Sequence, residues 1–298
     1  MVGFDGAIRS GRWSVQLTFL GTAAAEGYPN AFCACDHCET ARTRGGRNIR
    51  RRSSALIDGQ FLIDLGPDLQ AASASLGIRL TGIRYAAQTH EHIDHLEPGN
   101  FFSRSDMVGV PNKVGMEWLA TAGALDRVNR TFDGFQPGES FASPAVQERF
   151  NVRHTAIAPF EEHQLGPYRV FAVPANHAKN IQPLLYAIQR DGRQLFYATD
   201  TTTLPAEVWR ALAERGWRFD VVAMDHTFGT EDRATGHLNA AAFRRHLDAM
   251  REHGLLAGNA RIYATHIAHH SNLPHEELVA MVTPHGYDVA WDGLTVEV

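Results

Sequence analysis

Four metal-binding side chains within six residues constrain this sequence more than any other feature. His90, His92, Asp94 and His95 directly follow the apolar run 83–88, which predicts a strand, so that strand's end would deliver all four. His90 and His92 can point the same way from an extended segment, whereas Asp94 and His95 need a turn and would point elsewhere. One metal ion cannot readily use all four side chains, but two ions about 3.5–4 Å apart could, and could activate a water for hydrolysis.

Two other interpretations of this run are weaker. A zincin His-Glu-x-x-His motif is excluded because Asp94 stands four residues after His90. A polar surface run that opens a helix would leave the register of the four side chains unexplained. The run therefore predicts a metal site.

The pattern of apolar residues predicts an α/β protein. Strands are expected at 15–20, 54–58, 60–64, 83–88, 169–173, 184–189, 194–199, 221–225, 261–265 and 288–298, and helices at 68–76, 114–125, 205–215, 239–253 and 274–282. Strands cluster in both halves and helices follow, which favours two sheets packed face to face with helices outside. A break between the halves is expected near 132–143. Because ligands come from both sides of it, residues 14–298 are expected to form one domain after a loose leader, 1–13.

Composition limits the partners and the location. The net charge of -5 and the pI near 6.3 give no global attraction to nucleic acid or anionic membranes. No segment approaches the roughly 20 apolar residues of a membrane span. The start of the chain is short and polar, without the apolar core of a signal peptide, so a cytoplasmic location is expected.

The motif His-x-His-x-Asp-His after a strand resembles the signature of the metallo-β-lactamase superfamily, and later segments supply matching residues. The resemblance implies an αββα sandwich of two mixed sheets with helices outside. Its implied assignment is His90, His92 and His177 on one metal, Asp94, His95 and His266 on the other, Asp200 as the bridge, and Asp64 as an orienting residue that binds no metal. Taken alone, a histidine after a strand is more often a structural residue, and Asp200 could cap a helix.

Three cysteines, Cys33, Cys35 and Cys38, are all that the chain contains. An odd, crowded set is a poor disulfide framework and favours a soft metal. A tetrahedral structural zinc needs a fourth ligand, and His269, three residues after His266, is the candidate. The alternatives are reduced cysteines in a turn, or a catalytic cysteine, although no single thiol stands out.

The cysteine loop, the ligand motif and the closing Trp291-Asp292-Gly293 together resemble the PhnP-type branch of phosphoribosyl cyclic phosphodiesterases, from about residue 15 to 298. The resemblance implies a hydrolase of a small anionic cyclic phosphate ester. It also implies two divalent ions (manganese, zinc or iron) with Asp94 essential among their ligands, and one structural zinc. Neither a membrane nor nucleic acid is expected as a partner, and a homodimer is left open.

Several residues are candidates for proton transfer or substrate contact. His237 matches the position of the proposed proton shuttle in PhnP-like enzymes, although it could instead cap the helix expected from Asn239, and His226 is a second candidate. Lys179, two residues after His177, could meet a phosphate. Six arginines between residues 42 and 52 could also bind phosphate or RNA, or form a solvated face.

Other proteins of this fold suggest alternative functions. PqqB-like proteins of cofactor biosynthesis share Gly27-Tyr28-Pro29 before the cysteine loop, but usually lack an intact His-x-His-x-Asp-His, which favours the hydrolase. A nuclease or a lactonase of this fold is a further alternative, although no long basic arm for tRNA is found. The substrate would be selected by loops such as 101–113 and 132–148.

Overall fold

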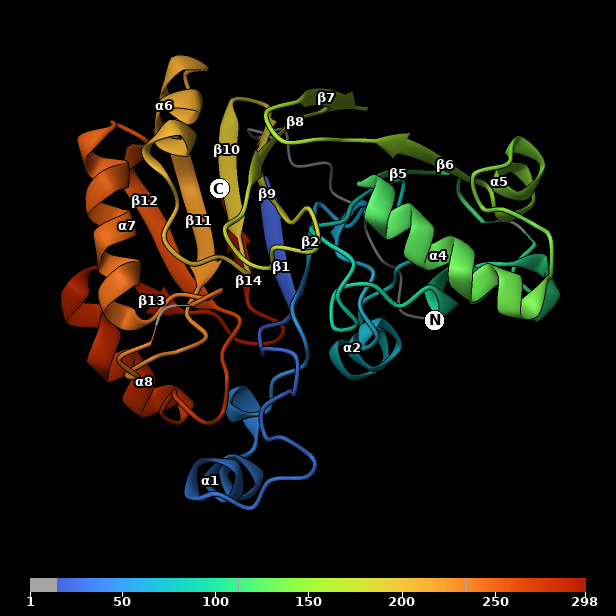
Figure 1. Ribbon diagram of the computed structural model, residues 1–298. Helices are drawn as coiled ribbons and strands as arrows, with labels where there is room; N and C mark the ends of the chain where they lie inside the picture. Colours follow the sequence, from blue (N-terminus) through green and yellow to red (C-terminus); the bar gives the residue numbers. More distant parts are fainter. Residues whose placement is uncertain (1–14, 112, 234) are drawn as a thin grey trace, which may run out of the picture.

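Two mixed sheets form the centre of the computed structural model, which describes residues 15–111, 113–233 and 235–298 (Figure 1). The first sheet has the strand order β14 (Thr295–Glu297), β1 (Gln16–Gly21), β2 (Ser54–Ile57), β3 (Phe61–Ile63), β4 (Tyr85–Ala87), β5 (Met116–Ala120) and β6 (Val152–Ala156). The second has the order β13 (Asp288–Val289), β12 (Leu256–Thr265), β11 (Phe219–Asp225), β10 (Arg193–Ala198), β9 (Leu184–Arg190), β8 (Tyr168–Pro174) and β7 (Glu162–Leu165).

Each sheet combines an antiparallel part with a parallel part. Strands β3 to β6 are parallel in the first sheet, and β10 to β13 are parallel in the second. The carboxyl ends of parallel strands meet at one edge of a sheet, where loops can bring distant residues together.

Helices cover the outer faces of both sheets, and Figure 1 shows α4 and α5 beside one sheet and α6 to α8 beside the other. Their bounds are α1 Asp36–Arg44, α2 Leu69–Leu76, α3 Gly99–Phe102, α4 Ala122–Phe135, α5 Pro144–Phe150, α6 Ala206–Glu214, α7 Ala240–Glu252 and α8 His275–Val282, with short 3-10 helices at Gly46–Asn48 (η1), Asp106–Val108 (η2) and Thr283–His285 (η3). The αββα sandwich predicted from the sequence is therefore confirmed.

Three apolar clusters hold these layers together. One lies between the sheets and includes Phe61 and Tyr186, one from each sheet. The outer clusters pack helices on the sheets, with Trp118 and Phe132 on one side and Phe243 on the other. Burial of such aromatic side chains supplies much of the driving force for folding.

The helix predicted at 114–125 is wrong. Residues Met116–Ala120 form β5, and α4 begins only at Ala122. Thr121 caps this helix, because its side chain accepts a hydrogen bond from the Ala124 backbone nitrogen. The buried segment is paired on both sides, with β4 and β6, so tertiary packing overrides its helical spacing.

Other boundaries also differ from the prediction. The strand predicted at 288–298 is two strands, β13 and β14, which belong to different sheets and are separated by Gly293 with φ +92°. Strands β6 and β7 were missed because their exposed edges carry polar residues. The change of sheet falls between β6 and β7 and not at 132–143. The leader predicted at 1–13 lies outside the described residues.

None of the helices in the described part of the chain has both the length and the apolar character that membrane crossing requires.

Replacing Phe132 by Ala is expected to lower the free energy of unfolding by about 3–5 kcal/mol, because its ring is fully buried against Phe102, Phe141 and Phe150. Chemical denaturation measures this loss. Phe135→Ala on the same helix is the control, because that side chain is 69% exposed and its loss should cost about 0.5 kcal/mol or less. Equal losses in the two variants would contradict the described face of α4.

Candidate dinuclear metal centre

The predicted ligands meet at one edge of the two sheets. The motif His90 to His95 follows β4, whereas His177, Asp200 and His266 follow β8, β10 and β12 of the second sheet. The structure therefore brings all seven predicted metal-binding residues together from both sides of the predicted break, in two groups.

The first group consists of three histidines. His90 Nε2 lies 3.0 Å from His92 Nδ1, and His177 Nε2 lies 3.1 Å from the same atom. A single ion at the usual metal–nitrogen distance of about 2.0–2.1 Å can be reached by three nitrogens at this spacing. Burial, together with neighbouring histidines, lowers the pKa of each ring, which favours the neutral form that binds metal.

The second group is Asp94, His95, Asp200 and His266. His95 Nε2 lies 3.1 Å from Asp94 Oδ2 and 3.0 Å from Asp200 Oδ2. His266 Nε2 lies 3.2 Å from the same Asp200 oxygen. All four side chains are buried.

Asp200 lies between the two groups. Its Oδ2 faces His95 and His266, while its Oδ1 lies 3.8 Å from His177 Nε2. Both Asp200 and His266 have φ +57°, a backbone conformation that non-glycine residues rarely adopt and that tends to occur at functional sites.

Unpartnered atoms in the second group fit a bound cation. His95 Nε2, Asp200 Oδ2 and His266 Nε2 are buried, and the oxygen lies 3.0 and 3.2 Å from the two nitrogens, yet none of the three atoms makes a hydrogen bond within the described residues. Burial alone would lower the pKa of His95, but Asp200, Asp94 and Asp64 raise it well above its usual value. The carboxylates thus attract positive charge, and the donor set of imidazole and carboxylate suits a divalent metal.

Asp64 lies directly behind this group. One of its oxygens accepts a hydrogen bond from the Thr89 backbone nitrogen at 2.8 Å, and the other lies 2.7 Å from His95 Nδ1. Gln88 Nε2 also donates to Asp64, at 2.9 Å. These contacts fix the orientation of the His95 ring, with Nε2 turned toward Asp94 and Asp200.

His237 adjoins the centre with its ring 4.7 Å from that of His177. Its Nδ1 lies 2.7 Å from Asp225 Oδ2. Burial lowers the pKa of His237, but the charge and hydrogen bond of Asp225 outweigh it and raise the pKa to about 9. The role of Asp225 was not predicted from the sequence. Its position could have indicated it, because Asp225 ends an apolar strand, as Asp200 closely follows one.

His226 and Lys179 were predicted as further contacts for a proton or a substrate. His226 is fully buried, and its ring nitrogens face Asn272 at 2.9 Å and the Tyr287 hydroxyl at 3.3 Å, so it is not available to a substrate. Lys179 is exposed in a turn two residues after His177. The hypotheses of proton transfer by His226 and of its contact with substrate are therefore corrected.

The three cysteines lie close to His269, where the sequence predicted the fourth ligand. The ligand atoms of Cys33, Cys35, Cys38 and His269 all lie within 4.8 Å of one another, and Cys35 Sγ is 3.6 Å from His269 Nδ1. Burial opposes ionisation of Cys35, but hydrogen bonds from the Cys38 backbone and from His269 lower its pKa to about 6. A thiolate at this position suits a zinc ion.

The six arginines between residues 42 and 52 all have partners within the protein. Arg42 pairs with Glu39, Arg44 with Glu277, Arg51 with Asp292 and Arg52 with Asp68, while Arg47 stacks on Trp291 and buried Arg50 donates to Thr22 and Ala290. Five of these guanidinium groups therefore donate hydrogen bonds within the protein, which leaves them less available to a phosphate or to RNA.

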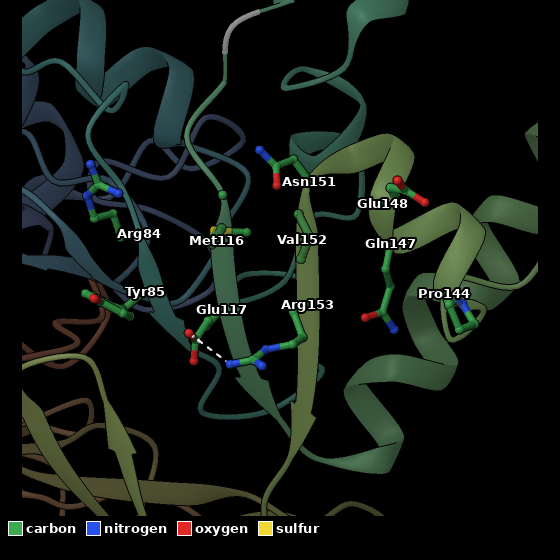
Figure 2. Close-up of a pocket in the computed structure, with 11 residues that line it drawn as sticks. Arg84, Tyr85, Met116, Glu117, Pro144, Gln147, Glu148, Asn151, Val152 and Arg153 are labelled. Atoms are coloured by element: carbon green, nitrogen blue, oxygen red, sulfur yellow. Dashed lines mark ion pairs between the residues drawn. The ribbon is translucent and has the colours of Figure 1, made fainter.

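A cavity of about 470 Å³ adjoins His92. Arg127 and Arg130, one turn apart on α4, line it together with Glu91 and Asn180. No ion pair of Arg130 occurs within the described residues. A further cavity, shown in Figure 2, lies at the opposite ends of β4 to β6 and contains none of the metal ligands; there Arg153 pairs with Glu117 at 2.9 Å.

Comparison with known proteins finds relatives and similar structures that match almost the whole chain. It is 26% identical to coenzyme PQQ synthesis protein B of Methylococcus capsulatus, over 94% of this chain and 99% of the relative. A diphosphatase of the PhnP family is similar in structure with a TM-score of 0.71 and 22% identity, over 96% of this chain and 98% of that one. Zinc-bound PqqB of Methylobacterium extorquens gives a TM-score of 0.69 and 20% identity, over 95% and 100%.

A family model, described as the beta-lactamase superfamily domain, matches residues 60–267. This range contains all seven residues of the two ligand groups, from His90 to His266, as well as Asp64 and His237. Since the match extends over more than half of the chain, the protein belongs to the metallo-β-lactamase superfamily.

Proposed function

We propose that this protein is a hydrolase that uses two divalent metal ions and cleaves a phosphodiester, with a small cyclic phosphate ester as its substrate. The observation that carries the proposal is the position of Asp200, whose two oxygens face two separate sets of ligand atoms. A single structural ion would not need such a bridge. Two ions held close together are typical of enzymes that cleave phosphate esters.

Different residues would hold each of the two ions. His90, His92 and His177 would hold one ion, Asp94, His95 and His266 the other, with Asp200 between them and Asp64 as the residue that orients His95. When bound, the ions would polarise the phosphoryl oxygen and lower the pKa of an attacking water. Manganese, zinc and iron all accept this donor set.

His237 would protonate the leaving alkoxide. Asp225 holds Nδ1 of the ring, which leaves Nε2 as the nitrogen that can donate a proton to a substrate. The cavity beside His92 would receive the rest of the ester, where Arg127 and Arg130 offer donors to an anionic group. Lys179 is a further candidate contact, because it is exposed and its neighbour Asn180 lines the same cavity.

Asp200→Ala is expected to lower metal occupancy and to reduce hydrolysis of bis(p-nitrophenyl) phosphate by at least about 100-fold, since losing even a residue that orients a ligand costs about 10–100-fold. Elemental analysis and steady-state kinetics of the metal-loaded protein measure the two effects. Asp248→Asn, an exposed carboxylate on α7, is the control and should change neither. Full activity in Asp200→Ala would refute the two-metal scheme.

His237→Gln is expected to lower kcat by about 10²–10⁴-fold for an ester with an alkyl leaving group, and far less for a p-nitrophenyl ester, whose leaving group needs no proton. Bound metal should be unchanged. His285→Gln, at an exposed position, is the matched control. If both leaving groups slow equally, His237 supports the centre and does not donate the proton.

A structural zinc would be held by Cys33, Cys35, Cys38 and His269. Cys35→Ser is therefore expected to remove one zinc ion per chain and to lower the melting temperature, while the catalytic ions remain. Ala34→Ser, in the same exposed loop, is the control. An unchanged zinc content in Cys35→Ser would argue against this site.

A second candidate function is a step in coenzyme synthesis, which the identity to PQQ synthesis protein B supports. The two functions separate in one experiment, a panel of cyclic nucleotides, bis-aryl phosphates and cyclic sugar phosphates given to the metal-loaded protein. Turnover of any of these supports the phosphodiesterase. Full metal loading without turnover of any of them favours the second candidate.

A further inference from the structure

A cavity of about 310 Å³ lies on the outer side of the first sheet, and its wall includes residues of α2 together with the polar residues Asn100, Arg104 and Lys113. Most of its wall is aliphatic, with contributions from Leu62, Leu65, Leu69, Leu80, Ile83 and Met116. Its volume is at the lower end of the range of about 300–1,000 Å³ that is usual for small-molecule sites. None of the proposed metal ligands lines it, so it is separate from the catalytic centre.

One cation in this wall has no acidic partner. Arg104 Nη1 lies 3.0 Å from Met116 Sδ, and Nη2 donates to the Val114 carbonyl at 2.6 Å. A thioether is a weak acceptor, and within the described residues no carboxylate pairs with Arg104. The other cation of the wall, Lys113, is already paired with Asp106.

The environment of Arg104 is unfavourable for a charge. Burial lowers the pKa of its guanidinium, and no neighbouring negative charge offsets that effect. A charge withdrawn from water costs free energy unless an opposite charge or several good acceptors compensate it. Arg104 is half-buried, and a bound anion would offset the cost of withdrawing its charge from water, while the aliphatic wall favours an anion with an apolar body.

We propose that this cavity binds an aliphatic monocarboxylate, with the carboxylate on Arg104 and the chain along Leu69, Leu80 and Ile83. A guanidinium holds a carboxylate through two parallel hydrogen bonds, which Arg104 can offer with the donors that Val114 and Met116 leave free. The tail is buried against side chains that otherwise line a hollow.

Calorimetric titration of the metal-loaded full chain tests the proposal with octanoate, octanol and acetate. Octanoate is expected to bind saturably, acetate not at all, and octanol more weakly because it lacks the charge. Arg104→Gln should weaken octanoate binding about tenfold or more, since hydrogen bonds to a charged group contribute about 1.5–3 kcal/mol. It should leave octanol binding unchanged. Equal octanoate binding by the native chain and Arg104→Gln would overturn the proposal.

Three further variants make the result specific. Arg84→Gln removes an exposed arginine of the other cavity and should bind octanoate as the native chain does. Leu80→Phe keeps Arg104 but narrows the hollow, so it should weaken both octanoate and octanol. If Leu80→Phe binds octanoate normally, the carboxylate lies elsewhere, for example at the metal centre, and the proposal fails. Arg104→Lys, which keeps the charge, should bind octanoate better than Arg104→Gln.

Discussion

Asp64, Asp94 and Asp200 place three buried carboxylates around the ring of His95. A buried carboxylate needs hydrogen-bond donors or opposite charge. Asp64 has donors from the backbone and side chain of Thr89, whereas Asp94 and Asp200 face mainly imidazoles. Hydrogen bonds from the protein therefore compensate the charge of Asp64, whereas the charges of Asp94 and Asp200 remain to be compensated by bound cations. The rest of the centre depends on this difference.

Both sheets are needed to create that condition. The first sheet delivers Asp64 and the motif from His90 to His95, and the second delivers Asp200 and His266. Positive φ values at Asp64, Asp200 and His266 turn the chain sharply where each strand ends, so that the side chains converge. Close approach also matters: a Cβ on Gly66 would lie 2.8 Å from the Asp94 carbonyl, so a larger residue there would displace the loop that carries this ligand.

Strand periodicity predicted two sheets packed face to face, and the dense run of donors from His90 to His95 predicted a metal site. The addition of His177, Asp200 and His266 to that site came from the resemblance to the superfamily, because a single histidine or aspartate after a strand carries no such signal by itself. The sequence did not predict β5, because a buried strand and a buried helix can share the same apolar spacing over 114–125. It also left the arginine-rich stretch open between a solvated face and a phosphate site. The partners of Arg44 and Arg51 are Glu277 and Asp292, more than 200 residues away, and only the fold brings them together.

The segment after β12 explains why the cysteine cluster lies beside the catalytic centre. His266 belongs to the second group of catalytic ligands, and His269, only three residues later, belongs to the cysteine cluster. Asn272 then donates to the carbonyls of His226 and Thr227, and the Thr227 hydroxyl lies 2.8 Å from His266 Nδ1. A zinc ion on the cysteines would therefore restrain the same loop that Thr227 and Asn272 hold in place. That zinc would add to a restraint that His266 already has from Thr227, so the catalytic ligands would stay in place without it.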